Sequence, residues 1–429
     1  MTNRLVSWLE RHLKALVLGV LTLITYVAAI NRDQALPWAI AALLAATLLA
    51  GLLWPHWLVT RLAVVRTGPD RAEEGETITF HIEVENLGWL PRFMVELVDR
   101  LPFAAVAREQ SASAAEATLG VIAYIPGRSR RRYDMPLVCE KRGFYRLGPI
   151  GLASSFPLGL AEARQTRNEG RQTLTVYPDV FTIVSLPLHG SPSQIHRGGY
   201  QLPEGAGAAE FSGLREYRRG DNPRHVHWPT TARLNELMVK EFEPLASACL
   251  HLVIDLHAAA NVGTGRHATL EYALRIAGSI ARYATMNGLR IRVSADGAQS
   301  LVIPSGSGEL HYREILDELA IADANGETPF ASLIERLSRQ IPRGETVVIF
   351  LAAPPEQTDA ILGALAMLRL RRANLFAVVF DRDSFSPTLR GSANSGQKGC
   401  DTLFAGLLDL DAHCVLVRSH DDLPRLFNP

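Results

Sequence analysis

Two long apolar runs near the N-terminus constrain this chain more than any other feature. Ala15–Ile30 is almost uninterrupted, a polar break follows at Asn31–Gln34, and the second run covers Ala39–Trp54. A helix needs about 20 mostly apolar residues to cross the hydrocarbon core of a bilayer, and each run reaches that length with its flanks. The pattern therefore predicts a two-helix transmembrane hairpin within residues 1–60, with spans at about 13–31 and 37–57.

Two alternatives exist for these runs. One is that both runs are buried helices of a soluble core. The other is that the first run is a secretory signal, which the preceding basic residues would suit. No small-x-small cleavage pattern precedes a folded region, and the second run follows at once. A retained hairpin is therefore favoured.

Charges beside the runs predict an orientation. The flanking basic residues are Arg4, Arg11 and Lys14 before the first run and His56, Arg61 and Arg66 after the second. The turn carries Arg32 against Asp33. Because positive charge accumulates on the cytoplasmic side of a membrane, both ends of the hairpin and the residues after it are expected in the cytoplasm.

The charge balance and the cysteines of the chain exclude some classes of function. Lys plus Arg and Asp plus Glu number 44 each, so the formal net charge is zero and no nucleic-acid partner is expected. The four cysteines, Cys139, Cys249, Cys400 and Cys414, lie far apart without CxxC spacing. They are expected to be free thiols in a reducing compartment rather than a disulfide framework or a metal site.

Residues 61–185 have the pattern of an antiparallel β-sandwich. Thr77–Glu85 alternates apolar and polar side chains, Asn86-Leu87-Gly88 favours a turn, and the alternation resumes at Phe93. Further strand-like stretches are Leu119–Tyr124, Tyr133–Cys139 and Leu174–Val176. Short strands at this spacing indicate a sandwich. The basic run at Arg128–Arg132 is interpreted as a solvated edge strand, with contact to anionic lipid as the alternative.

A linker rich in Gly, Pro and Ser is expected at 186–209, and the C-terminal part then alternates strands with helices. Strands are predicted at Leu250–Leu256, Leu289–Val293, Thr346–Leu351 and Leu375–Phe380, with an edge strand at Cys414–Val417. Helices are predicted at Ala268–Asn287, Glu309–Leu319, Phe330–Arg339 and Gln357–Leu370. This alternation indicates a Rossmann-type α/β domain with a mostly parallel sheet covered on both faces. Ligands of such sheets bind beyond the carboxyl ends of the strands, where Asp255 and Ala353-Pro354-Pro355 stand.

The most informative soluble stretch is EFSGLREYRRGDNPRHVHW, Glu210–Trp228, followed by a strand-like Leu237–Phe242. Its candidate interaction residues are Glu210, Phe211, Gly213, Leu214, Arg215, Glu216, Tyr217, Gly220, Asp221, Arg224, His227, Trp228, Ala232 and Arg233. One interpretation is an arginine-lined anion pocket or partner surface, because the guanidinium fork suits carboxylate and phosphate. The favoured alternative is a buried ion-pair network that holds the linker on the sheet. Trp228 is large enough to anchor the residues around it.

No catalytic residue is assigned. The sequence has no GxSxG elbow, no Walker-type loop and no HExxH motif. His225 and His227 would share one strand face, but alternate histidines are more often core or surface residues than ligands. Glu216 and Asp221 would act as acid and base only if an apolar pocket separated their pKa values.

The same stretch carries a family resemblance. The order EFSGLREYRRGDNPRHVHW, then Ala232-Arg233, then a strand ending in Val239-Lys240-Glu241-Phe242-Glu243, resembles the diagnostic block of the domain-of-unknown-function 58 (DUF 58) family. Upstream, KRGFYRLGP at Lys141–Pro149 and VYP at Val176–Pro178 are similar to further family segments. Phe156–Leu160 departs from the DPFGL that members often carry. With the two apolar runs, the resemblance covers nearly the whole chain.

The resemblance implies an architecture and a setting. Members look like a membrane hairpin, a β-sandwich and a von Willebrand factor A-like domain, here within 210–429. They are similar in setting to partners of MoxR-type AAA+ ATPases in the bacterial inner membrane, and are often grouped with transglutaminase-like membrane proteins. The resemblance implies no defined biochemical activity.

A von Willebrand factor A domain normally holds a divalent cation through Asp-x-Ser-x-Ser, plus a Thr and an Asp from later loops. The corresponding residues are Asp255, His257 and Ala259, so only the first ligand is retained. Mg²⁺ requires several hard oxygen ligands, and one carboxylate does not supply them. No adhesion-type metal centre and no cofactor are therefore expected.

Together these inferences predict a multidomain chain that acts as a membrane-anchored cytoplasmic scaffold without catalytic activity. The expected partners are a MoxR-type ATPase and the lipid bilayer, with a transglutaminase-like membrane protein as a further possibility. The alternative is an anion-binding or hydrolytic enzyme that uses the arginine-rich block at 210–233.

Overall fold

The computed structural model describes residues 2–32, 35–99, 117–166, 169–186, 209–217, 226–234, 236–244, 249–342, 344–352, 354–386 and 396–428. These residues divide into two compact units, Met1–Tyr177 and Pro178–Pro429. Each unit has an apolar core of its own.

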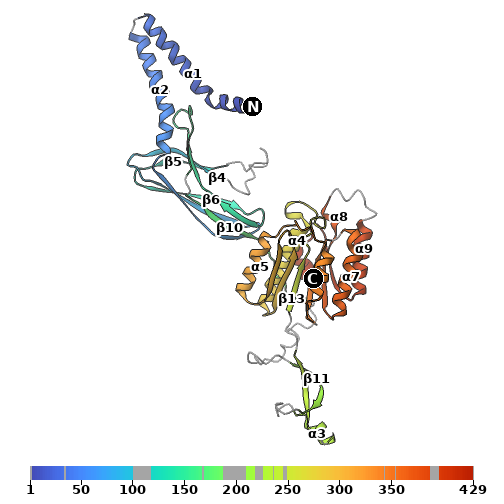
Figure 1. The fold of residues 1–429 in the computed structure, drawn as a ribbon. Helices are drawn as coiled ribbons and strands as arrows, with labels where there is room; N and C mark the ends of the chain where they lie inside the picture. The colour runs from blue at the N-terminus through green and yellow to red at the C-terminus, as the bar shows by residue number, and fades with distance from the viewer. Residues whose placement is uncertain are drawn as a thin grey trace. The chain divides into compact units, whose positions relative to one another are not determined.

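The first unit begins with two long helices, α1 (Thr2–Arg32) and α2 (Ala35–Val59), which pack against each other (Figure 1). Leu13–Asn31 and Ala35–Val59 are long and apolar enough to cross a membrane. Only 6% and 11% of their most apolar windows are buried. The alternative of two buried core helices is therefore wrong, because a core helix would be mostly covered by protein.

Aromatic side chains lie near both ends of α2. The ring of Trp38 lies 5.7 Å from that of Tyr26 on α1, and the rings of Trp54 and Trp57 are 5.8 Å apart. At 1.5 Å per residue, Trp38 and Trp54 are about 24 Å apart along the helix. An apolar segment with aromatic residues at both ends is typical of a membrane span.

Three sheets follow α2, with strand orders β1-β3-β6, β2-β10-β7 and β5-β4-β8-β9. The strands are β1 (Leu62–Thr67), β2 (Arg71–Glu73), β3 (Thr77–Asn86), β4 (Arg92–Asp99), β5 (Ala117–Ile125), β6 (Arg130–Val138), β7 (Gly143–Leu147), β8 (Gly151–Ser154), β9 (Ala163–Thr166) and β10 (Gln172–Tyr177). Paired strands in these three sheets run antiparallel, except for β2 and β10, which run parallel.

Apolar residues from all three sheets meet in one core. In β3, Ile78, Phe80, Ile82 and Val84 are all buried, as the alternation predicts. They pack with residues of the other sheets, such as Leu97, Leu174 and Val176. The short strands β1, β2, β7, β8 and β9 were not predicted, because segments of this length with mixed polarity carry little periodic signal.

The basic run at Arg128–Arg132 continues into β6, which lies at the edge of its three-stranded sheet. Arg130 pairs with Glu85 across the strands at 3.2 Å, and Arg132 pairs with Asp134 at 2.8 Å. These arginine side chains are more than half exposed. This placement agrees with the interpretation as a solvated edge strand.

The second unit contains a six-stranded sheet with the order β15-β14-β13-β16-β17-β18. Its strands are β13 (Cys249–Ile254), β14 (Arg290–Asp296), β15 (Ser300–Gly306), β16 (Thr346–Leu351), β17 (Asn374–Phe380) and β18 (His413–Val417). All neighbours run parallel except β14 and β15. The edge strand β15 was not predicted, because its Pro304 and terminal glycine weaken the strand pattern.

Helices pack on both faces of this sheet (Figure 1). α4 (Thr269–Met286) contacts α5 (Glu309–Ile321), whereas α6 (Phe330–Ser338), α7 (Thr358–Leu370) and α9 (Gly396–Asp409) form a second group. Val347, Ile349 and Leu351 of β16 share a core with this second group. The remaining short helical elements are α3 (Trp228–Leu234), η4 (Gly265–His267), η5 (Pro355–Gln357), α8 (Arg382–Phe385) and α10 (Leu423–Phe427).

The two units divide after Tyr177, earlier than the predicted domain end at 185. The Phe181 N–H donates to Ser279 Oγ of α4 at 3.0 Å, and the Val184 N–H donates to Asn428 Oδ1 at 2.7 Å. The ring of Phe181 also lies 5.7 Å from that of Phe427. Residues 178–186 are therefore held by the second unit. Most of the predicted linker lies outside the described residues.

Candidate functional site

The candidate block folds around a two-stranded antiparallel sheet. β11 (Ala209–Glu216) pairs with β12 (Met238–Pro244), with Arg215 opposite Val239 and Glu216 opposite Met238. The register shifts between Phe211 and Gly213, which makes a bulge in β11. The predicted strand at Leu237–Phe242 corresponds to β12, whereas β11 was not predicted.

Local hydrogen bonds hold α3 beside β12. The His227 N–H donates to Met238 O at 2.8 Å, and the Met238 N–H donates to Thr231 Oγ1 at 3.0 Å. The His227 ring nitrogen Nδ1 lies 2.8 Å from Thr230 Oγ1, and the Tyr217 N–H donates to Leu237 O at 2.7 Å. His227 and Tyr217 therefore position the turn that carries α3, and His227 Nδ1 is engaged by a hydroxyl.

Large apolar side chains stay exposed on this block. Trp228, the first residue of α3, is 66% exposed, Leu234 is 57% exposed and Leu237 is 47% exposed. None of the residues of α3, all of which the structure describes, is buried. The expectation that Trp228 anchors the residues around it is therefore wrong, because most of its side chain is exposed. We call Trp228, Leu234 and Leu237 the Trp228 surface.

The charged members of the block are only partly described. Glu216, Ala232 and Arg233 are exposed, so Glu216 and Arg233 do not belong to a buried ion-pair network. Gly220, Asp221 and Arg224 lie outside the described residues. For Glu210, Phe211, Gly213 and Arg215 the structure describes the backbone pairing. An anion pocket formed by the arginines stays a prediction.

A second set of polar residues lies at the carboxyl ends of β13 and β17. β13 has β14 on one side and β16 on the other, so the chain reverses its direction of strand addition here, where parallel sheets bind ligands. Asp255 follows β13 and is 3% exposed. Its Oδ1 accepts the His257 N–H at 2.9 Å, and Asn261 Nδ2 donates to the Asp255 carbonyl at 2.9 Å.

Burial governs the electrostatics of Asp255. It raises the pKa of the Asp255 carboxyl to about 7, although the His257 N–H and the positive charge of Arg382 act in the opposite direction. Arg382, which follows β17, donates from Nη2 to Ala259 O at 2.9 Å. Among the described residues, Asp255 Oδ2, His257 Nδ1 and Arg382 Nε are buried without a hydrogen-bond partner.

These residues do not fit the divalent-cation site of a von Willebrand factor A domain. His257 and Ala259 supply no hydroxyl, and the nearby guanidinium of Arg382 repels a cation. Within the described residues, no three His, Cys, Asp or Glu side chains group as metal ligands. That no divalent cation binds at Asp255 stays a prediction, which titration with Mg²⁺ or Mn²⁺ would test. Arg382 and Asn261 were missed, although Arg382 stands beyond the carboxyl end of a predicted strand.

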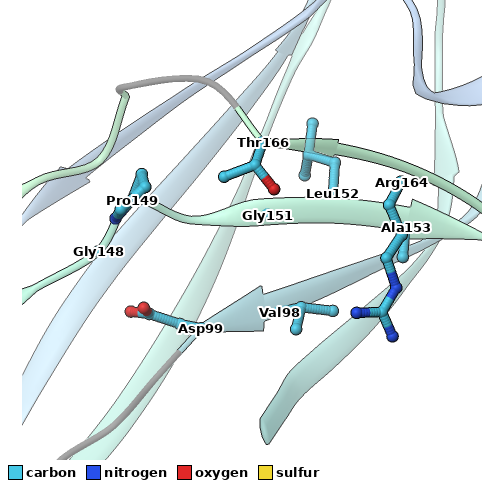
Figure 2. A pocket seen from close by; sticks show the side chains of 9 residues that line it. All are labelled: Val98, Asp99, Gly148, Pro149, Gly151, Leu152, Ala153, Arg164 and Thr166. Carbon is cyan, nitrogen blue, oxygen red and sulfur yellow. The ribbon is translucent and has the colours of Figure 1, made fainter. Parts of the chain in front are cut away.

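A cavity of about 280 Å³ in the first unit is lined by residues of β4, β8 and β9 and by Gly148 and Pro149 (Figure 2). Figure 2 shows the Asp99 carboxylate and the Arg164 guanidinium at opposite ends of the lining residues. Asp99 is buried and forms an ion pair with Arg66, whose side chain is also buried. Arg164 pairs with Glu162 at 2.5 Å. Asp99 and Arg164 thus both form ion pairs within the protein, and we assign no reaction to this cavity.

Comparisons with known proteins show what this part of the chain is similar to. The model of the family "Protein of unknown function DUF58" matches residues 213–370, which include α3, β12, Asp255 and β16. The chain is also similar to the uncharacterized protein YeaD of Bacillus subtilis, a distant homologue. The two are 23% identical over 330 residues, which cover 77% of this chain and 79% of YeaD.

Solved structures resemble the chain only weakly. The CARDB domain of the PF1109 protein from Pyrococcus furiosus is 14% identical, covering 27% of this chain and 86% of that chain, with a TM-score of 0.20. The superoxide reductase from Ignicoccus hospitalis is 13% identical, covering 27% of this chain and 82% of that chain, with a TM-score of 0.17. Similarities at this level carry no argument about fold or function.

Proposed function

We propose that the chain is a membrane-anchored cytoplasmic adaptor without catalytic activity, which binds a protein partner through the Trp228 surface. The exposure of Trp228, 66% at the start of a helix with no buried residue, is the observation that supports this proposal best. Tryptophan is enriched among the residues that dominate the binding energy of protein interfaces. Leu234, at the end of the same helix, and Leu237, just before β12, are exposed as well.

The partner that we propose is a MoxR-type AAA+ ATPase, with a transglutaminase-like membrane protein as a further component of the assembly. The resemblance to the DUF 58 family supports this choice, and the family match at 213–370 contains the whole Trp228 surface. Arg233, on the same short helix as Trp228, is exposed as well. A mixed apolar and arginine surface is typical of protein interfaces.

We interpret the three sheets of the first unit as a β-sandwich and the second unit as a von Willebrand factor A-like domain. The shared core of the three sheets and the mostly parallel order of the six-stranded sheet support these assignments. The hairpin would cross the inner membrane of a bacterium twice. The basic residues on both of its flanks favour cytoplasmic placement of both units.

Site-specific photo-cross-linking in native membranes tests the proposal. The full chain carries a photoreactive residue at 228 or, as a control, at 310, where Leu310 of α5 is 83% exposed. We expect a cross-link to an AAA+ ATPase from position 228 and none from position 310. Equal cross-linking from both positions, or no ATPase adduct from 228, would contradict the proposal.

A further inference from the structure

The loop between β8 and β9 lies against α2 inside its apolar segment. The α2 residues Gly51, Pro55, Leu58 and Val59 are buried and form one stripe of the helix. A Cβ atom added at Gly51 would lie 2.5 Å from Leu160 Cδ1 and 3.3 Å from Leu158 Cδ1. The loop therefore reaches at least eight residues, or about 12 Å, along α2 from its end at Val59.

The depth of this contact follows from the tryptophans of α2. Trp54 and Trp57 stand near the end of the span, at the level where aromatic residues meet the lipid headgroups. Gly51 lies about one turn nearer the bilayer centre than Trp54. Leu158 and Leu160, which contact Gly51, thus lie at or just inside the boundary between headgroups and acyl chains.

The composition of the loop suits that depth. Residues 155–161, SFPLGLA, carry no charge. Leu160 is buried against α2, whereas Pro157, Leu158 and Gly159 are exposed at the tip, Leu158 by 44%. Phe156 stacks on Phe93 at 6.0 Å between ring centroids, which fixes the base of the loop on β4. The exposed tip is therefore apolar and firmly positioned.

We infer that the first unit binds the bilayer through the Pro157-Leu158-Gly159 tip, in addition to its attachment by the hairpin. The occupant of this surface is lipid at the level of the glycerol and upper acyl chains. Apolar groups in such positions are buried about 5–10 Å below the headgroup surface. The inference rests on the membrane anchoring in the proposed function, but it does not depend on the protein partner.

Spin labelling of the full chain in vesicles of phosphatidylcholine and phosphatidylglycerol tests the inference. The four native cysteines, of which Cys139 and Cys249 are buried, are replaced by alanine. One nitroxide is then placed by Leu158→Cys, Val138→Cys or Leu43→Cys. Val138 is 50% exposed and lies at the end of β6 that pairs with Thr77, far along β3 from α2. Leu43 is 68% exposed in the middle of α2.

We expect collisions with oxygen to exceed collisions with a water-soluble nickel chelate at 158 and 43, and the reverse at 138. If the label at 158 collides more with the nickel chelate, like the label at 138, while the label at 43 collides more with oxygen, the inference is overturned and the membrane anchoring stands. A label at 43 that reports water would overturn the anchoring as well.

Discussion

β16 and α3, both in the second unit, differ in whether their apolar side chains are buried. Every residue of β16 is buried between neighbouring strands and helices, whereas no residue of α3 is buried. In β16 the apolar residues stabilise the unit itself. In α3 a tryptophan remains largely in water, and its burial would release free energy only when a partner covers it. This difference separates the residues that hold the fold from those that we assign to binding.

The largest effect is expected in β16. Ile349 is 0% exposed and packs in the core with α6, α7 and α9. Ile349→Ala removes buried methyl groups and leaves a cavity, so we expect it to lower the free energy of unfolding by about 2–5 kcal/mol. Urea titration of the full chain in detergent, followed by hydrogen exchange of β16 amides, measures this change. A loss below about 1 kcal/mol would contradict the description of β16 as core.

The pH dependence of stability tests the buried edge of the same sheet. Burial raises the pKa of Asp255 from 3.8 to about 7, so between these values the folded state holds a proton that the unfolded state has released. The contribution of Asp255 is complete below about pH 4 and is lost as the pH rises to 7, by up to ~1.4 kcal/mol per pH unit. The control variant Asp255→Asn, which does not titrate, should show a flatter curve over this range. Parallel curves for the two proteins would contradict a raised pKa of Asp255 in the folded state.

Leucine truncation in the Trp228 surface should have little effect on folding. Leu237 is 47% exposed, and its backbone carbonyl, not its side chain, accepts the hydrogen bond from Tyr217. We expect Leu237→Ala to change the free energy of unfolding by less than about 0.5 kcal/mol. The same urea and exchange measurement compares it directly with Ile349→Ala. A loss as large as that of Ile349→Ala would place Leu237 in a core and remove it from the binding surface.

The elements that the sequence predicted best have a local apolar signal. The two long helices, β3, β13, β16 and β17 each contain a periodic or continuous apolar run, which can be recognised within the segment itself. The segment Pro178–Leu186 has no such run. Its place in the second unit depends on Ser279 and Asn428, which lie far away in the sequence.

The sequence predicted where the candidate site lies along the chain, but not whether its side chains are buried or exposed. The arginine-rich motif located the block, yet nothing in the sequence indicated whether another element covers Trp228. The structure answers this question, because α3 has no buried residue. Arg382 at the carboxyl edge was missed for a related reason. Its proximity to Asp255 arises from the parallel order of β13, β16 and β17, which separate stretches of the chain create.

The central claim is that the Trp228 surface binds the partner. Its most direct test is the dissociation constant between the full chain in lipid nanodiscs and a purified MoxR-type ATPase, measured for wild type, Trp228→Ala and the control Leu310→Ala. Loss of a dominant interface tryptophan costs at least about 2 kcal/mol, so we expect Trp228→Ala to bind roughly 30-fold more weakly. Leu310→Ala should bind like wild type. Unchanged affinity of Trp228→Ala would contradict the account.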